Sequence, residues 1–257
     1  MKKKSVISVL LFLPAVLWGQ QSTGKTHRPF AALFGKAPHA QAANSATAQP
    51  ARSEDLNAVL AKMDVAAKNF RSAQADFEWD QYQRVVEEHD IQKGQIYFRH
   101  TKTGMDAAVK VVSPEPKQVL FKDGKLSLYQ PKIDQVTEYK ANASRADVES
   151  FMSLGFGASG KDLARNFEIK LDGWENVDGV RTAKLDLTPK QEKLKSSLSR
   201  VLLWLEPEKN ISMKQQFFEP NGDYRLTHYT NIKVNGKIPD NVFRLKTTSS
   251  TKVVHAQ

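Results

Sequence analysis

Residues 118–136 read Gln-Val-Leu-Phe-Lys-Asp-Gly-Lys-Leu-Ser-Leu-Tyr-Gln-Pro-Lys-Ile-Asp-Gln-Val and predict two β-strands with a tight turn between them. Asp123-Gly124 is a pair typical of two-residue hairpin turns, and apolar side chains alternate with polar ones on either side of it. A further strand is predicted at 135–139. Links this short leave no room for a crossover helix, so neighbouring strands are expected to be antiparallel.

The same period-two pattern extends along most of the chain. It begins where Ala75, Phe77 and Trp79 alternate with acidic residues. Further strands are predicted at 95–99, 107–112, 118–121, 125–129, 135–139, 167–171, 180–187, 200–205, 211–218, 224–232 and 242–245. The fold class is therefore mainly β (α+β), with an antiparallel sheet of ten or eleven strands, and strand twist must curl a sheet of this size.

Two helical patterns supply apolar faces that could fill the curled sheet. The first is expected at 53–73. Ser53 stands at its start as the capping residue, and Leu56, Val59, Met63 and Phe70 recur at helical spacing. The second spans 145–154 and leads into a glycine-rich run. If these helices fill the concave face completely, the interior is an ordinary core. If they fill it loosely, it is an apolar cavity with a lid.

The N-terminus is typical of an export signal. Lys2 to Lys4 precede an apolar run from Val6 to Leu17, and cleavage is expected after Gly19; an uncleaved anchor is the alternative. Residues 20–52 are predicted to be a disordered leader before a domain at 53–257. Its apolar cluster at 30–34 either stays in solvent or docks on the domain.

The net charge of +10 comes mainly from this N-terminal segment. Seven bases and no acid precede Ser53, whereas the rest of the chain has 31 bases and 28 acids. A nearly balanced domain argues against nucleic acid as a partner. The chain has no cysteine, which excludes a disulfide and a lipidated N-terminal Cys.

Several segments resemble the LolA-like outer-membrane lipoprotein carriers and, more broadly, the LolA/LolB superfamily. They are the strand 94–99, the run 117–125, the Tyr-Gln-Pro motif at 129–131 with Gln135-Val136, and residues 185–190. The resemblance covers roughly residues 53–254. It implies an incomplete antiparallel β-barrel, wrapped around or capped by two or three short helices, with a cavity that shelters acyl chains. It also implies a periplasmic monomer that receives lipoproteins from an inner-membrane lipoprotein-release transporter and delivers them to an outer-membrane receptor.

The candidate site residues belong to apolar faces of the predicted strands and of the lid. The expected cavity residues are Phe77, Trp79, Ile96, Phe98, Leu128, Phe151, Met152, Trp204 and Phe217, and Leu154 and Phe156 share the apolar character of the lid. The alternative is that all of them form a close-packed core. The run 201–205 is apolar without alternation, which predicts burial on both faces.

The resemblance also implies a lid latch, with one departure. The carriers have an arginine directly before proline in the second strand, where this chain has His100-Thr101. Arg99, one position earlier, is the candidate latch. Because a shift of one residue reverses the side of the sheet, its alternative is a solvent-facing arginine.

Covalent chemistry is not expected. No histidine pair has metal-ligand spacing, no nucleophile can be matched with a base, and neither a metal nor a cofactor is predicted. The run 155–160 is glycine-rich but follows a helix, unlike a phosphate-binding loop. Lys190 to Lys195 is expected to be an exposed loop. The alternatives to a lipoprotein carrier are a sensing module of the same fold, of the envelope-stress regulator type, and a carrier of another envelope lipid.

Overall fold

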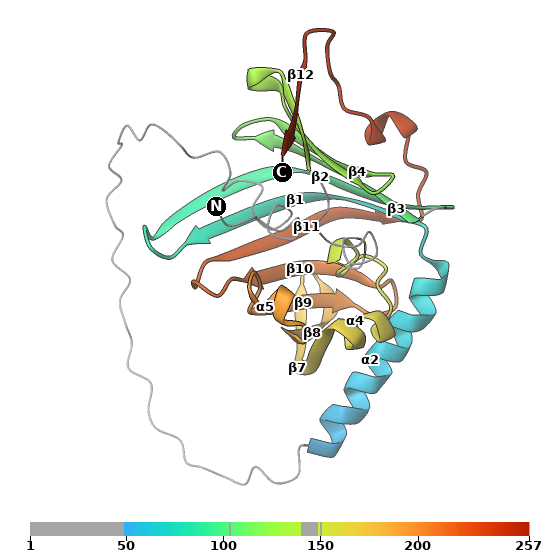
Figure 1. Cartoon of the computed structure of the whole chain (residues 1–257). Coiled ribbons are helices and arrows are strands. Elements are labelled where there is room, and N and C mark those ends of the chain that lie inside the picture. Colours follow the sequence, from blue (N-terminus) through green and yellow to red (C-terminus); the bar gives the residue numbers. More distant parts are fainter. Residues whose placement is uncertain (1–48, 103, 140–148, 150, 257) are drawn as a thin grey trace.

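The computed structural model describes residues 49–256, apart from 103, 140–148 and 150 (Figure 1). The predicted signal peptide, most of the predicted leader and most of the predicted helix at 145–154 lie outside the described residues. None of the helices in the described part of the chain is long and apolar enough to cross a membrane.

Helix α2 spans Gln49–Asn69. Residues 49–52 were predicted to be disordered, yet they form its first turn, where proline is tolerated. The helix also ends before residue 73, the predicted end. Asn235 explains this, because its side chain accepts from Arg71 N and donates to Asn69 O, while its backbone N donates to Ser72 O. These bonds direct residues 71 and 72 out of the helix and into the first strand.

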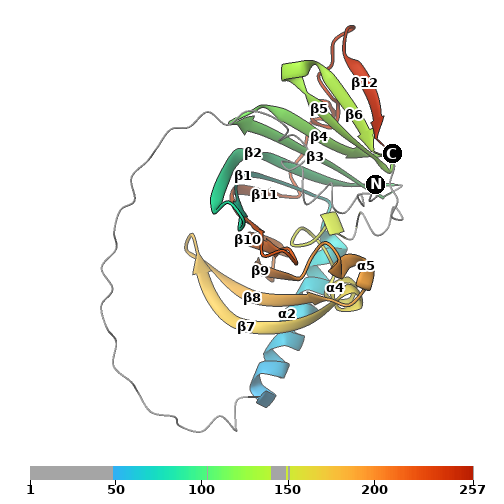
Figure 2. The same ribbon diagram turned by 60° about the vertical axis from the view of Figure 1, so that its left-hand side comes forward.

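The strands form one twelve-stranded sheet with the order β12-β6-β5-β4-β3-β2-β1-β11-β10-β9-β8-β7. Their bounds are β1 (Ser72–Gln83), β2 (Glu88–Thr101), β3 (Gly104–Ser113), β4 (Lys117–Lys122), β5 (Lys125–Gln130), β6 (Gln135–Tyr139), β7 (Phe167–Val177), β8 (Val180–Pro189), β9 (Arg200–Glu206), β10 (Ile211–Phe218), β11 (Tyr224–Val234) and β12 (Lys252–Ala256). β12 and β7 are its two edges and do not pair, so the predicted incomplete barrel is confirmed. Figure 2 shows the open curl.

Two details of the predicted sheet are wrong. Residues 242–245 are not a strand: η2 (Asp240–Phe243) is a 3₁₀ turn that crosses the outer face of the sheet, where Phe243 packs on Ala108. The chain then reaches the far edge and adds β12, which pairs with β6 in parallel. Thr248, Ser250 and Thr251 donate hydrogen bonds to the Asp134 carboxylate just before β6, so β12 starts at the same end as β6 and runs the same way.

The sheet consists of two meanders, β1–β6 and β7–β11, joined through the pairing of β1 with β11. β6 lies near one edge and β7 forms the other, so the chain between them must cross from one side of the sheet to the other. The described part of this crossing includes residues 151–159 and helix α4 (Gly160–Asn166), which Ser159 caps by accepting from Asp162 N at 3.0 Å. The topology thus places the predicted lid against the concave face.

The concave face carries two apolar clusters. One unites the inner residues of β1–β5, such as Phe98 and Phe121, with Phe156. The other joins Val59 and Met63 of α2 to the inner residues of β8 and β9. In Figures 1 and 2, α2, α4 and the short helix α5 (Glu192–Lys195) gather beside β7–β9. The exposed loop predicted at 190–195 is therefore partly helical, although no residue of α5 is buried.

Candidate functional site

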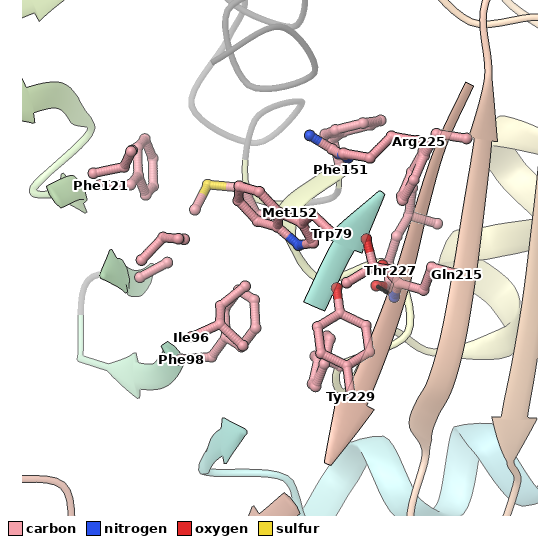
Figure 3. Close-up of a pocket in the computed structure, with 16 residues that line it drawn as sticks. Trp79, Ile96, Phe98, Phe121, Phe151, Met152, Gln215, Arg225, Thr227 and Tyr229 are labelled. Atoms are coloured by element: carbon pink, nitrogen blue, oxygen red, sulfur yellow. Dashed lines mark hydrogen bonds between the residues drawn. The ribbon is translucent and has the colours of Figure 1, made fainter. Parts of the chain in front are cut away.

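An apolar cavity of about 80 Å³ lies between the inner face of the sheet and residues 151–156 (Figure 3). Six of the nine predicted cavity residues line it: Trp79, Ile96, Phe98, Phe151, Met152 and Phe217. The other lining residues are Ala107, Val109, Val119, Phe121, Leu154, Phe156, Gln215, Arg225, Thr227 and Tyr229. The period-two pattern thus identified the correct face of β1 and β2, and the structure adds β3, β4 and β11.

Three predicted cavity residues lie elsewhere. Phe77 stacks on Trp79 with ring centroids 4.2 Å apart, and Leu128 is buried on β5; both belong to the core around the cavity without lining it. Trp204 lies on the opposite face of the sheet, where it pairs in register with Lys184 and Lys214. Burial on both faces of β9 is confirmed, but Trp204 was assigned to the wrong face.

Polar and charged side chains on the outer face nevertheless contact Trp204 closely. Its indole N–H donates to Glu175 Oε2 at 2.5 Å, and the Lys214 ammonium lies 4.5 Å from its ring centroid. Hydrogen bonds from Trp204 and Lys184 lower the pKa of Glu175. This polar covering explains how a large aromatic residue is buried on the side of the sheet away from the core.

Arg99 also lies on the outer face, which corrects the predicted latch. Its guanidinium bonds to Asp106 and Asp240 and lies 4.1 Å from the Phe243 ring centroid. These contacts hold the C-terminal segment, residues 235–251, across the sheet. Because Phe98 faces the cavity, its neighbour Arg99 must face away from it.

The residues from Leu154 to Ala158 are hydrogen-bonded to β10 and to Asn210, which directly precedes it. Gln215 Nε2 donates to Leu154 O at 2.7 Å, and Asn210 Nδ2 donates to Ala158 O at 2.8 Å. Backbone bonds add Ser212 N to Gly155 O and Gly157 N to Asn210 O. We call residues 154–158 the anchored segment.

Phe151 and Met152 precede the anchored segment and are only half-buried. Both point into the cavity, and the Phe151 ring lies 5.8 Å from that of Phe217. Leu154 and Phe156, by contrast, are fully buried. Leu154 and Phe156 are therefore core, whereas Phe151 and Met152 are the less buried residues of the predicted lid.

The polar residues of the cavity share one wall. Tyr229 donates to Gln215 Oε1 at 3.0 Å, and Thr227 lies next to them on β11. Burial raises the pKa of Tyr229 and lowers that of Arg225. The Arg225 guanidinium lies between two rings, 5.1 Å from the Trp79 centroid and 5.2 Å from that of Phe217.

The sequence analysis did not include Arg225 among the cavity residues, because an arginine in a strand usually faces solvent. Its alternation with Thr227 and Tyr229 was a signal that β11 turns it inward. The opposite wall, formed by β2–β4, is apolar throughout. Among the residues that the structure describes, no group of three or more His, Asp or Glu side chains could hold a metal ion. The arrangement suits binding of an apolar ligand.

Comparisons with known proteins agree with this architecture. The family model described as outer membrane lipoprotein carrier protein LolA matches residues 68–246. No curated protein matches the chain.

Several solved structures have a similar fold. The crystal structure of MucB has a TM-score of 0.50 and 14% identity, covering 78% of this chain and 66% of that chain. An uncharacterized conserved protein from Thermus thermophilus has a TM-score of 0.50 and 10% identity, covering 79% and 99%. A LolA superfamily protein from Nitrosomonas europaea has a TM-score of 0.37 and 15% identity, covering 74% and 97%. The chain thus spans just under two thirds of the MucB chain, and the likeness to MucB and to the Thermus thermophilus protein shows the fold alone.

Proposed function

Because the chain belongs to the LolA family of outer membrane lipoprotein carrier proteins, we propose that it is a periplasmic carrier of lipoproteins. In this role it shelters acyl chains in the cavity and moves lipoproteins from the inner to the outer membrane without covalent chemistry. The observation that carries the proposal is the apolar cavity beneath residues 151–156.

The physical requirement follows from the cargo. Each buried CH₂ contributes about 0.8 kcal/mol, so a 16-carbon chain left in water costs on the order of 12 kcal/mol. The wall formed by Ile96, Phe98, Val119 and Phe121 has no polar side chain. Such a wall lowers that free energy without directional bonds that would slow release.

The cavity must enlarge to hold a chain. Its volume of about 80 Å³ is well below the roughly 300–1,000 Å³ typical of ligand sites. Phe151 and Met152 occupy the space, and within the described residues it is 154–158, and not these two, that hydrogen-bond to β10 and Asn210. We therefore expect cargo to displace these two side chains, so that the described conformation is the closed form.

A matched pair of substitutions tests the cavity. Val109 lines it, whereas Val112 lies on the same strand with 60% of its surface exposed. Val109→Trp should weaken binding of an acylated peptide by about tenfold or more, because the indole fills the space. Val112→Trp should bind as the unmodified protein does. Equal affinity of both variants would show that the cavity is not the binding site.

The transfer step needs its own assay. Inner-membrane vesicles carrying a radiolabelled lipoprotein are incubated with the protein, and the label in the supernatant is measured. Release that Val109→Trp abolishes would support a carrier. Acyl binding without release would instead favour the sensing module, and release of a different envelope lipid would favour the other carrier.

Membership of the LolA family also supports a proposal for the export, the oligomeric state and the partners of the carrier. Residues 1–19 act as the export signal, 20–52 form mainly a tether, and the domain from 53 onward works as a monomer. Its partners are an inner-membrane lipoprotein-release transporter and an outer-membrane receptor. N-terminal sequencing of the protein from the periplasmic fraction should begin at Gln20.

A further inference from the structure

Five polar side chains, four of them buried, lie near one another on the concave face, at one end of the cavity. Arg225 and Asp90 each lie directly opposite Gln81 in the strand register. Gln92 donates to Asp90 Oδ2 at 2.6 Å. Lys117 is near enough that the charge of Asp90 raises its pKa, although burial lowers it more. We call these five residues the polar row.

Burial of the polar row needs an explanation. Gln81, Gln92, Lys117 and Arg225 are only 4% to 9% exposed. Within the described residues, no group hydrogen-bonds Oε1 of Gln81 or Oε1 of Gln92. A buried acceptor without a donor destabilises the fold by about 1–3 kcal/mol. Gln81 is the register partner of Arg225 and Gln92 is that of Trp79, and Arg225 and Trp79 both line the cavity, which suggests that a ligand bound there supplies the donors.

The charges of the polar row favour an anion. Its cations are Arg225 and Lys117, and its acid is Asp90. Glu219 lies at the end of β10, where burial and the nearby Asp223 raise its pKa to about 7. Burial thus disfavours the charged form of Glu219 beside Arg225, and within the polar row itself the two cations outnumber the one carboxylate, that of Asp90.

The polar row also continues directly into the apolar cavity. Arg225 belongs to both, and Figure 3 shows it at the end of the cavity next to Phe151. From there the wall formed by β2–β4 is apolar. A ligand that satisfies both regions has a charged end and a hydrocarbon end.

We propose that the polar row binds the head group of an acidic, hydroxylated lipid whose acyl chain occupies the cavity. Arg225 donates to the anionic group, and the oxygens of Gln81 and Gln92 accept from hydroxyl or N–H groups of the same head. This inference rests on the proposed function, because it assumes that the cavity takes an acyl chain.

Three lipids with the same myristoyl chain test the inference on the full-length protein. Lysophosphatidylglycerol has a net negative charge and head-group hydroxyls, lysophosphatidylcholine has no net charge, and monoacylglycerol has hydroxyls without charge. Each displaces a neutral fluorescent probe from the cavity. A charge-assisted hydrogen bond should make the acidic lipid bind about 10- to 100-fold more tightly than either of the others.

Variants assign the preference to Arg225. Arg225→Gln should reduce it to about twofold or less, and Arg225→Lys should retain part of it. The matched control is Arg181→Gln, since Arg181 also stacks on a tryptophan, Trp174, at 4.2 Å but is exposed. It should keep the full preference.

The outcomes separate the two proposals. Equal affinity for the three lipids in the unmodified protein would overturn the head-group inference and leave the carrier intact, whether or not any variant folds. Failure of all three to bind would overturn the carrier itself and the inference with it. A preference that persists in Arg225→Gln would also contradict the assignment.

Discussion

The buried carboxyl of Glu219 should make the stability of the protein depend on pH. The residue follows the last position of β10, and its side chain is 8% exposed. Burial is the main cause that raises its pKa, the negative charge of Asp223 adds to it, and Arg225 acts in the opposite direction. The result is a pKa of about 7 in place of the ordinary 4.5.

The direction of the pH dependence follows from whether the folded or the unfolded state binds the Glu219 proton more tightly. Below about pH 4.5 both states hold it, and the fold is not penalised. As pH rises, the unfolded chain releases the proton first, so stability falls until the folded state also ionises near pH 7. The difference between the two pKa values corresponds to about 3 kcal/mol, a large part of the roughly 5–15 kcal/mol of a typical domain.

Urea unfolding followed by tryptophan fluorescence at pH 5 and pH 8 measures the effect. Glu219→Gln should be close to the unmodified protein at pH 5 and more stable by up to about 3 kcal/mol at pH 8. Glu115→Gln is the control, because Glu115 is exposed and its pKa is lowered by Lys132. If Glu219→Gln and the unmodified protein lose stability in parallel between these pH values, the reasoning is refuted.

Two further predictions concern close packing and the outer face. Gly157→Ala should lower the free energy of unfolding by on the order of 3 kcal/mol, because φ is +81° and a Cβ would lie 2.3 Å from the Phe70 ring. Gly179→Ala is the control, because its φ is +79° but no atom lies within 4 Å of the added Cβ. It should lower the free energy of unfolding by only about 1 kcal/mol, as measured by thermal unfolding. Equal losses would contradict the packing argument. Arg99→Ala removes the bond to Asp240 and should speed hydrogen exchange in the C-terminal segment, without changing lipid affinity. Unchanged exchange there would show that Arg99 does not hold the segment.

The short-range pattern of apolar and polar residues was enough to predict much of the sheet. The hairpin at 118–136 forms as predicted, with Lys122 paired to Lys125 across Asp123-Gly124. Alternation on β2 correctly placed Ile96 and Phe98 on the cavity side. These features depend on neighbours a few residues apart, so the sequence carries them directly.

Hydropathy alone fails for two side chains, one on β9 and one on β11. On β9, Leu203 faces the core while Trp204 is buried by lysines of β8 and β10 on the other side. On β11, Arg225 faces inward between two aromatic rings. Hydropathy alone assigns Trp204 and Arg225 to the wrong side of the sheet, since the residues that make their burial favourable come from other strands.

The sequence by itself determined the family, the strand-rich architecture and the apolar face of β1 and β2, because these depend on composition and short-range period. Only the tertiary structure decided that β1 joins β11, that residues 151–156 lie against the concave face, and that β12 runs parallel to β6. Those pairings join residues far apart in the chain. They also decide which residues line the cavity and bring Arg225, Gln81 and Asp90 together at one end of it.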